Sequence, residues 1–232
     1  DIVSQYGVDK NKITVAYPGY DREKFSARGG SSFGRKVKEV KRKYKIGDNY
    51  LIYIGTIQPR KNLVRLMEAF GRVASERSEL ELVIVGKTKG EGRQGWMYED
   101  ILQTPKKLGI ENKIKFLGFL STEDLQGLLS GALTFIQVSL WEGFGIPAVE
   151  AMATGVPVIV SNISSLPEVV GKAGLLVDPY SVDQIEQAIR TIVADKRLQQ
   201  KYSKAGIAQA KKFSWDKMAR EVLKVFKKIG NV

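Results

Sequence analysis

Six apolar runs, each without a regular polar alternation, are the feature that most constrains how this chain can fold. Strands that are buried on both faces carry such runs, and parallel sheets with helices on both sides contain strands of this kind. The runs lie at residues 50–55, 80–86, 113–120, 133–139, 156–161 and 173–179. The sequence therefore predicts an α/β fold built on a doubly wound parallel sheet.

Helical patterns alternate with these runs. Residues 62–73, for example, carry Leu63, Leu66, Met67 and Phe70 at the spacing of one helix face. Two segments interrupt the alternation, 26–34 and 91–95, and both are predicted to be flexible loops. The predicted helices are 62–73, 121–132, 147–155 and 181–194, followed by two more that close the chain.

The composition excludes several classes of chemistry. The 232 residues include neither histidine nor cysteine, so this sequence holds no Ser-His-Asp triad, no histidine base and no Cys/His metal site. No Asp-x-Asp pair offers a metal bridge to a diphosphate. The GKT at 86–88 resembles the end of a phosphate loop, but Glu81 occupies the position where that loop needs its first glycine, so an ATPase is not favoured. No G-x-G-x-x-G follows a predicted strand, so a dinucleotide-dependent redox enzyme is not favoured either. No apolar run approaches about 18 residues, so no membrane-spanning helix is predicted.

A formal charge of +12 favours anionic partners. Much of it lies in residues 35–45 and 201–228. The alternative is that these are the solvated faces of charged helices. Nucleic acid is not the expected partner, because the aromatic residues near the basic ones, such as Phe213 and Phe226, occur at core-like helical spacing.

Ligands of open parallel sheets bind at the carboxyl ends of strands. At one strand end Gly55 permits a tight turn, and Arg60 and Lys61 stand just before a helix, which together make an anion site. The alternative is a basic loop in which Asn62 caps the helix. Gly118 at another strand end leaves backbone free to contact a nucleobase.

The segment WEGFGIPAVE (141–150) holds two carboxylates around a glycine turn. Gly143 and Gly145 leave backbone N–H groups open to a phosphate at the start of a helix. Glu142 lies in the loop and Glu150 one turn into the helix, so the two do not share a face. We interpret them as binding hydroxyls of two different sugars, one on each side of a diphosphate held by the turn. The alternative for Glu150 is an exposed helix residue.

Taken in order, several segments resemble the family 4 retaining glycosyltransferases, and the resemblance covers nearly the whole chain. The segments are VAYPGYDREKF, IGTIQPRKNLVRLMEAF, LVIVG, FLGFLSTEDLQGLLSGA and SLWEGFGIPAVEAMATGVPVIVSNISSLPEVVGKAGLLVDP. The E-x7-E element from Glu142 to Glu150, with GFGIP inside it, is its most specific part.

The resemblance implies roles for individual residues. Glu142 would hold the donor sugar and Glu150 the ribose hydroxyls. Lys61 matches the family's diphosphate lysine. Thr56 stands where many members have an arginine, and Arg60 is expected to supply that cation. As catalytic residues the resemblance thus implies Glu142, Arg60 and Lys61, and as donor-binding residues Gly55, Thr56, Gly118, Phe119, Leu120, Gly143, Phe144, Gly145, Ile146 and Glu150.

The resemblance also implies an architecture and a reaction. Members have two Rossmann-like domains with the active site between them, and residues 1–232 match the C-terminal, donor-binding one. The expected reaction transfers a sugar from a nucleotide-diphosphate sugar, with retention and with neither a metal nor a further cofactor. Residues 56–62 and 162–170 favour GDP-mannose. The acceptor, a glycan or a lipid-linked one, would bind the N-terminal domain, so this piece alone is expected to bind donor but to transfer poorly.

Three further expectations concern partners and alternatives. A cytoplasmic protein that touches the inner membrane face through its basic surface fits a lipid-linked acceptor. A nucleotide-sugar 2-epimerase shares the two-domain architecture and is the second enzyme hypothesis. A non-catalytic nucleotide- or RNA-binding module is the rival from another class.

Overall fold

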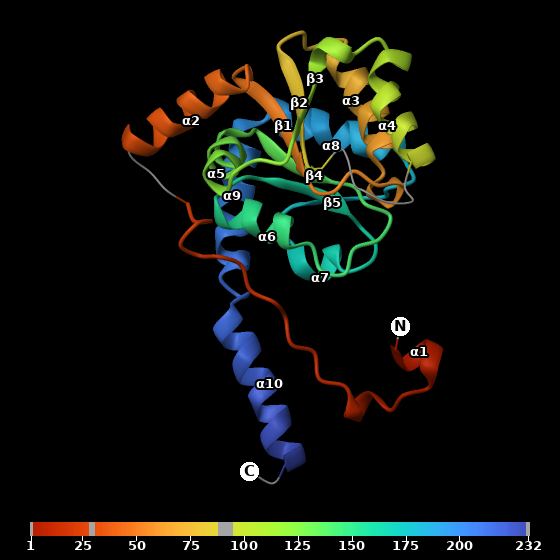
Figure 1. The fold of residues 1–232 in the computed structure, drawn as a ribbon, viewed down its shortest axis with the longest axis vertical. Helices are drawn as coiled ribbons and strands as arrows, with labels where there is room; N and C mark the ends of the chain where they lie inside the picture. Colours follow the sequence, from red (N-terminus) through yellow and green to blue (C-terminus); the bar gives the residue numbers. More distant parts are fainter. Residues whose placement is uncertain (1, 28–30, 88–94, 231–232) are drawn as a thin grey trace.

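The computed structural model describes residues 2–27, 31–87 and 95–230. At its centre lies a six-stranded sheet in which all neighbouring strands are parallel, in the order β3-β2-β1-β4-β5-β6 (Figure 1). The strands are β1 (Asn49–Ile54), β2 (Leu80–Val85), β3 (Ile114–Gly118), β4 (Thr134–Gln137), β5 (Val158–Ser161) and β6 (Leu175–Val177). Each lies at one of the six apolar runs, which confirms the predicted doubly wound sheet.

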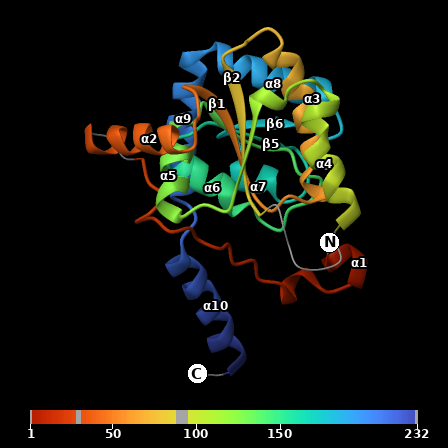
Figure 2. The same ribbon diagram turned by 45° about the horizontal axis from the view of Figure 1, so that its top comes forward.

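Helices cover both faces of this sheet (Figure 2). One face carries α3 (Leu63–Ala74), α4 (Gly95–Lys107) and α8 (Val182–Ala194). The other face carries α2 (Ser31–Lys43), α5 (Thr122–Gly131), α6 (Ile146–Ala153) and α7 (Leu166–Val170). Helix α9 (Lys196–Ala210) packs on α6 and α8. Along β1 the side chains alternate between the two cores, since Tyr50 and Ile52 belong to one and Leu51 and Tyr53 to the other. All four are fully buried, which explains why the strand reads as one apolar run.

Both segments predicted to be flexible loops lie partly outside the described residues, and a helix begins within each of them. In the segment 26–34, residues 28–30 are not described, and Ser31 begins α2, so the prediction of a loop through residue 34 was wrong. Local composition misled it, because α2 is anchored further along by Val40, which is buried against Gly127 of α5. In the segment 91–95, residues 91–94 lie outside the described part, and Gly95 begins α4. Helices α2, α4 and α7 are additional to those predicted.

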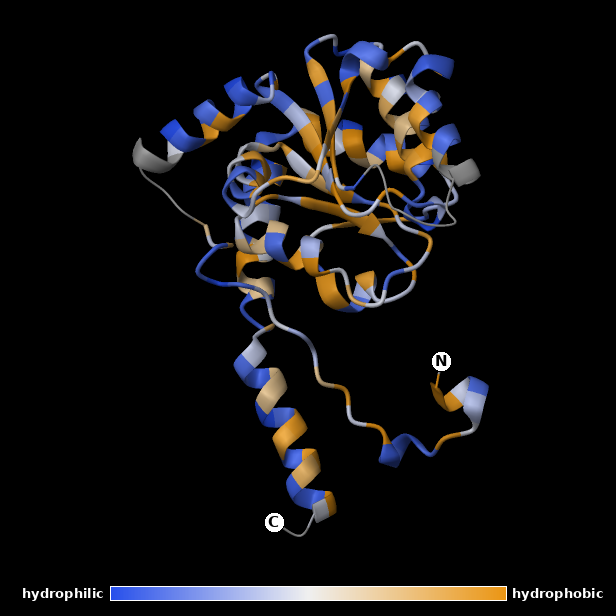
Figure 3. Ribbon diagram, viewed as in Figure 1, coloured by the Kyte–Doolittle hydropathy of each residue, from blue (hydrophilic) through white to orange (hydrophobic). Residues whose placement is uncertain are grey.

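The two terminal segments project away from the sheet. The short helix α1 (Ile2–Tyr6) and the chain that follows it run along one side, and α10 (Trp215–Gly230) extends below the domain (Figure 1). Apolar and polar residues form separate stripes on α10 (Figure 3), and none of its residues is buried. Within the described ranges, none of the helices combines the length and the apolar character that crossing a membrane requires.

Glycines continue the ladder of hydrogen bonds beyond three adjacent strands. The N–H of Gly55 donates to the carbonyl of Val85 at 2.9 Å, and the N–H of Gly86 donates to the carbonyl of Gly118 at 2.9 Å. A Cβ on Gly86 would lie 1.9 Å from the carbonyl oxygen of Gly55. The carboxyl ends of β1 and β2 therefore approach each other as closely as they do only because residue 86 has no side chain.

We expect Gly86→Ala to destabilise the protein, because the new Cβ would clash with the backbone carbonyl of Gly55. A backbone group held in the sheet cannot move away as the end of a flexible side chain can. The free energy of unfolding from urea titration should fall by about 2 kcal/mol. Gly34→Ala is the control: its Cβ would meet open space in α2, and alanine there should raise stability by up to about 1 kcal/mol. Equal stability of Gly86→Ala and the parent chain would contradict the steric argument.

Candidate functional site

The order of strands reverses its direction between β1 and β4, and crevices for ligands form at the carboxyl ends of strands at such a point. The segment after β1 contains a short 3₁₀ turn, Pro59–Lys61, and leads into α3. The segment after β4 contains the glycine turn and leads into α6. The predicted residues of both segments therefore meet at one edge of the sheet.

Glu142 lies at the centre of this meeting point and is only 8 % exposed. Its Oε1 accepts three hydrogen bonds, from Nζ of Lys61 at 2.5 Å, Nε2 of Gln137 at 2.6 Å and Oγ of Ser139 at 2.7 Å. Within the described part of the chain, its Oε2 has a single partner, Nη1 of Arg60 at 3.5 Å. One carboxylate oxygen is thus fixed within the protein, and the other is available to a ligand.

These contacts keep Glu142 ionised. Burial by itself raises the pKa of this carboxyl, but the hydrogen bonds from Lys61, Ser139 and Gln137 together outweigh burial and hold its pKa below the usual value. Lys61 is itself 7 % exposed, so its ammonium is directed at Glu142 and is not a freely solvated cation.

Further hydrogen bonds join the segments after β1 and β4. The N–H of Leu140 donates to the carbonyl of Arg60 at 2.8 Å, and Nη1 of Arg60 donates to the carbonyl of Trp141 at 3.0 Å. Asn62 precedes α3, as the capping alternative expected, but its side chain does not cap the helix. It donates instead to the carbonyls of Val138 and Pro179 at 3.0 and 2.7 Å, which ties the segments after β4 and β6 together.

The glycine turn offers backbone N–H groups at the start of α6. Among the described residues, the N–H groups of Gly143, Phe144 and Gly145 have no hydrogen-bond acceptor. Gly145 has a φ of +98°, and a Cβ there would lie 2.6 Å from Cδ2 of Leu166, so only glycine fits. Free N–H groups at a helix N-terminus favour an anion such as a phosphate.

Serine side chains hold this turn in place. The N–H of Glu142 donates to Oγ of Ser164 at 3.0 Å, and Oγ of Ser165 donates to the carbonyl of Glu142 at 3.0 Å. None of the four side chains that hold Glu142 and the turn was among the predicted site residues: Gln137, Ser139, Ser164 and Ser165. A polar residue such as Gln137 within an otherwise apolar run was the signal that could have indicated one of them.

The ring of Phe144 does not face the turn. It packs in an aromatic cluster with Tyr17, at 6.1 Å between ring centroids, and with Phe213, at 5.4 Å. What Phe144 offers a ligand is its backbone N–H. Ile146, which follows Gly145, begins α6 and is half-buried.

Glu150 differs from Glu142 in its surroundings. It is half-buried on α6, so the alternative of an exposed helix residue was wrong, and no hydrogen bond or ion pair joins its carboxylate to another described residue. Burial raises its pKa, and the negative charge of Asp21 raises it further, to about 7. Glu150 therefore lies on the helix that the glycine turn begins, as a carboxyl group without a cation beside it.

The predicted base-contacting residues lie at the end of β3. Gly118 has a φ of +68° with open space beside it, and Phe119 is 78 % exposed with Nζ of Lys87 at 6.0 Å from its ring centroid. Leu120 is buried in the core, so only its backbone can contact a ligand. At the end of β1, Thr56 is exposed, and its carbonyl accepts a long hydrogen bond, 3.4 Å, from the hydroxyl of Tyr53.

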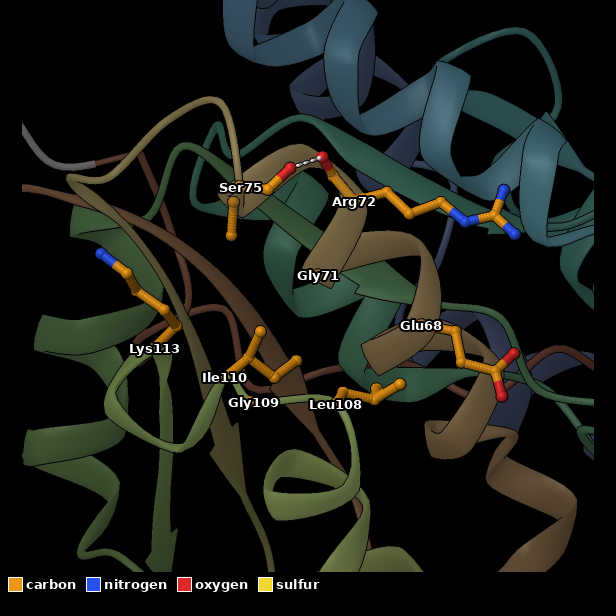
Figure 4. Close-up of a pocket in the computed structure, with 9 residues that line it drawn as sticks. Glu68, Gly71, Arg72, Ser75, Leu108, Gly109, Ile110 and Lys113 are labelled. Atoms are coloured by element: carbon orange, nitrogen blue, oxygen red, sulfur yellow. Dashed lines mark hydrogen bonds between the residues drawn. The ribbon is translucent and has the colours of Figure 1, made fainter.

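A separate cavity of about 640 Å³ lies elsewhere in the molecule (Figure 4). It is lined by the last turns of α3, including Gly71 and Arg72, by Ser75 directly after that helix, and by residues 108–110 and Lys113. Lys113 directly precedes β3, so this cavity lies at the amino end of the sheet, opposite to Glu142. It shares no residue with the site described above.

One family model and several curated proteins match the sequence of this chain. A family model described as Glycosyl transferases group 1 matches residues 36–209. The chain is 38 % identical over 190 residues to the O-antigen chain mannosyltransferase B of Escherichia coli, covering 81 % of this chain and 48 % of that protein. It is 30 % identical over 233 residues to the MMP alpha-(1->4)-mannosyltransferase of Mycolicibacterium hassiacum, covering 98 % of this chain and 51 % of that protein. This chain spans about half the length of these two relatives.

Solved structures share the fold. HepE of Anabaena, described in complex with UDP and glucose, superposes with a TM-score of 0.82 at 22 % identity, covering 99 % of this chain and 60 % of that one. The C-terminal domain of the group 1 family protein LpcC from Francisella tularensis superposes with a TM-score of 0.70 at 24 % identity, covering 84 % of this chain and 97 % of that one. The fold of this chain is therefore the Rossmann-like fold found in such domains.

The buried pair predicts a pH-dependent effect of Lys61→Met. Because the pKa of Glu142 is lower in the folded chain than in the unfolded chain, ionised Glu142 stabilises the fold above the unfolded pKa, and this stabilisation is lost as the pH falls through the folded pKa. Removing the ammonium leaves a buried carboxylate without its closest cation. We expect a loss of about 3 kcal/mol at pH 8 and a smaller loss at pH 4, where Glu142 of the variant is protonated.

Urea unfolding at the two pH values measures this difference. Lys172→Met, which removes an exposed lysine, is the matched control and should change stability little at either pH. An equal loss for Lys61→Met at pH 4 and pH 8 would show that the pair contributes packing rather than charge.

Proposed function

This chain belongs to the glycosyl transferases group 1 family, and from that premise we propose that it is the donor-binding part of an enzyme that transfers a hexose from a nucleoside-diphosphate sugar. Family membership itself implies transferase activity. The identity of the donor, the hexose and the stereochemical course are our proposals.

The observation that carries the proposal is the geometry of Glu142. Three donors fix Oε1 of this carboxylate, while Oε2 faces a guanidinium at 3.5 Å beside a turn with free N–H groups. A carboxylate oriented in this way can accept a hydrogen bond from a sugar hydroxyl in a defined position. The neighbouring cations and N–H groups suit the diphosphate attached to that sugar.

The other predicted residues then complete a donor site. Glu150, which has no cation partner, would accept hydrogen bonds from the two ribose hydroxyls. The exposed backbone and ring at Gly118 and Phe119 would contact the base. Thr56 leaves the end of β1 without the arginine that many members carry, and Arg60 supplies a guanidinium on the same side as Glu142.

The reaction proposed is transfer with retention. The bond between the anomeric carbon and the diphosphate oxygen breaks, while the oxygen of an acceptor hydroxyl bonds to that carbon on the same face of the sugar and gives its proton to the leaving diphosphate. Negative charge then grows on the leaving diphosphate. Arg60, Lys61 and the N–H groups of the turn would stabilise it in place of a metal ion, and electrostatic stabilisation of this kind usually contributes more to catalysis than any other single effect.

The extent of the chain supports its assignment to one half of such an enzyme. It spans about half of the two mannosyltransferase relatives and nearly all of an isolated C-terminal domain. We propose that residues 1–232 form the donor-binding domain, that a glycan or lipid-linked acceptor binds a further domain, and that this chain alone transfers sugar poorly. The names of the two relatives favour mannose as the hexose. GDP as its carrier is the expectation drawn from residues 56–62 and 162–170.

The family match does not favour the two alternatives. Neither a nucleotide-sugar 2-epimerase nor a nucleotide- or RNA-binding module is the class to which the matched family belongs. The basic residues of α2 and α10 are mostly exposed, which fits either a solvated face or contact with an anionic partner.

Nucleotide binding to this chain tests the proposal. Calorimetric titration with GDP, UDP and ADP should show binding of one of them, GDP by our expectation, and the affinity should rise from pH 6 to pH 8. The sign follows from the pKa of Glu150 near 7, because only the ionised carboxylate accepts a hydrogen bond at both oxygens.

Glu150→Gln should bind that nucleotide about tenfold more weakly at pH 8 and should lose the pH dependence. Glu111→Gln, at an exposed position before β3 and at the opposite end of the sheet, serves as the control. If no nucleotide bound, or if Glu150→Gln bound it as tightly as the parent chain, the donor site as proposed would be wrong.

Contact with an anionic membrane remains a further prediction, together with a cytoplasmic location. On α2, none of Arg35, Lys36, Lys38 and Arg42 forms an ion pair with a described residue. Each basic residue near such a surface contributes about 1 kcal/mol. The chain should therefore cosediment with acidic vesicles at low salt and be released by 0.5 M salt, roughly where the Debye length falls below 5 Å. Neutral vesicles are the control, and equal binding to both would exclude the electrostatic contact.

A further inference from the structure

Trp141 is an exposed indole next to the most buried polar network of the site. It is 57 % exposed, whereas Glu142, the next residue, is 8 % exposed. Most other large apolar side chains of comparable exposure lie on the terminal segments, such as Tyr6 and Phe226. Neither the sequence analysis nor the donor site proposed above gives Trp141 a role.

The structure holds Trp141 in a fixed position. Its carbonyl accepts a hydrogen bond from Nη1 of Arg60 at 3.0 Å, and the N–H of Leu140 donates to the carbonyl of Arg60 at 2.8 Å. The guanidinium of Arg60 lies 5.8 Å from the centroid of the indole ring, within the range of a cation–π contact. The ring also reaches the glycine turn, since a Cβ on Gly143 would lie 3.9 Å from its Cη2.

Three chemically different groups therefore converge at one place. An apolar aromatic surface, the free oxygen Oε2 of Glu142 and the guanidinium of Arg60 lie beside one another. A pyranose ring presents the matching groups, because one of its faces exposes C–H groups and its rim carries hydroxyls. A diphosphate has no apolar face, and the proposed base contacts lie at the end of β3.

We propose that Trp141, with the guanidinium of Arg60 in cation–π range of its ring, is the platform for the hexosyl group of the donor. The apolar face of the sugar rests on the indole, and a sugar hydroxyl donates to Oε2 of Glu142. Trp141 is then a residue that positions the sugar and distinguishes a nucleotide sugar from a bare nucleotide. The inference rests on the proposed function, because it takes the donor to bind at Glu142.

A purely structural role makes a different prediction. If Trp141 only shielded the buried pair of Lys61 and Glu142 from water, its removal would disturb the network that also serves the diphosphate. The affinities for nucleotide and for nucleotide sugar would then fall together. A platform for the sugar affects the nucleotide sugar alone.

The test compares the dissociation constants of GDP and GDP-mannose, and of UDP and UDP-glucose, by calorimetric titration of the whole chain. Covering ~60 Å² of apolar surface corresponds to about a tenfold change in affinity. We expect the parent chain to bind one nucleotide sugar about tenfold more tightly than the matching nucleotide. Trp141→Leu should lose this ratio while its affinity for the bare nucleotide stays unchanged, and Trp141→Phe should recover part of it.

Trp215→Leu is the matched control, because Trp215 is a second exposed indole, on α10, and is not part of the site. It should keep the affinity ratio of the parent chain. An unchanged ratio in Trp141→Leu, a ratio near one in the parent chain, or an equal weakening of both ligands would overturn the platform while leaving nucleotide binding intact. Failure of the parent chain to bind any of these four ligands or ADP would overturn the proposed function as well.

Discussion

The buried ion pair between Lys61 and Glu142 is the interaction on which the site depends. It joins the segments after β1 and β4, which are 81 residues apart, across the point where the strand order reverses. Removing two charges from water is costly, and the attraction between them compensates only when further hydrogen bonds satisfy both. Gln137 and Ser139 supply those bonds to Glu142. The orientation of the carboxylate therefore follows from the fold of both segments at once.

The two carboxylates of the site carry different charge states because their surroundings differ. Glu142 is surrounded by donors and a cation, which lower its pKa despite its burial. Glu150 is half-buried without a cation and near Asp21, and its pKa rises to about 7. The positive charge of Arg60 and Lys61 thus stays at one end of the turn, where a diphosphate would lie, and the end near Glu150 suits neutral hydroxyls. This separation gives one short stretch of sequence a cationic end, at Arg60 and Lys61, and an end without a cation, at Glu150.

The turn is also linked to the two terminal segments. Phe144 of the turn packs with Tyr17, which precedes the domain, and with Phe213, which precedes α10. The two segments cross closely, since a Cβ on Gly19 would lie 2.1 Å from the backbone nitrogen of Trp215. Arg22 donates to the carbonyls of Lys211 and Phe213 and so fastens the crossing. The position of the glycine turn is therefore tied to the packing of both terminal segments.

The sequence by itself determined the sheet, because a strand buried on both faces must be apolar along its length, and it marked the ends of the strands through Gly55, Gly118 and the glycine turn before α6. The glycine turn between Glu142 and Glu150 also made these two carboxylates candidates for ligand binding. The sequence did not show that α2 begins at Ser31, since Val40 anchors that helix to a distant one. The pairing of Glu142 with Lys61, the part played by Gln137, and the pKa of Glu150 were decided only by the tertiary structure. Charge state and hydrogen bonding depend on which side chains meet in space, and those neighbours come from elements far apart along the chain.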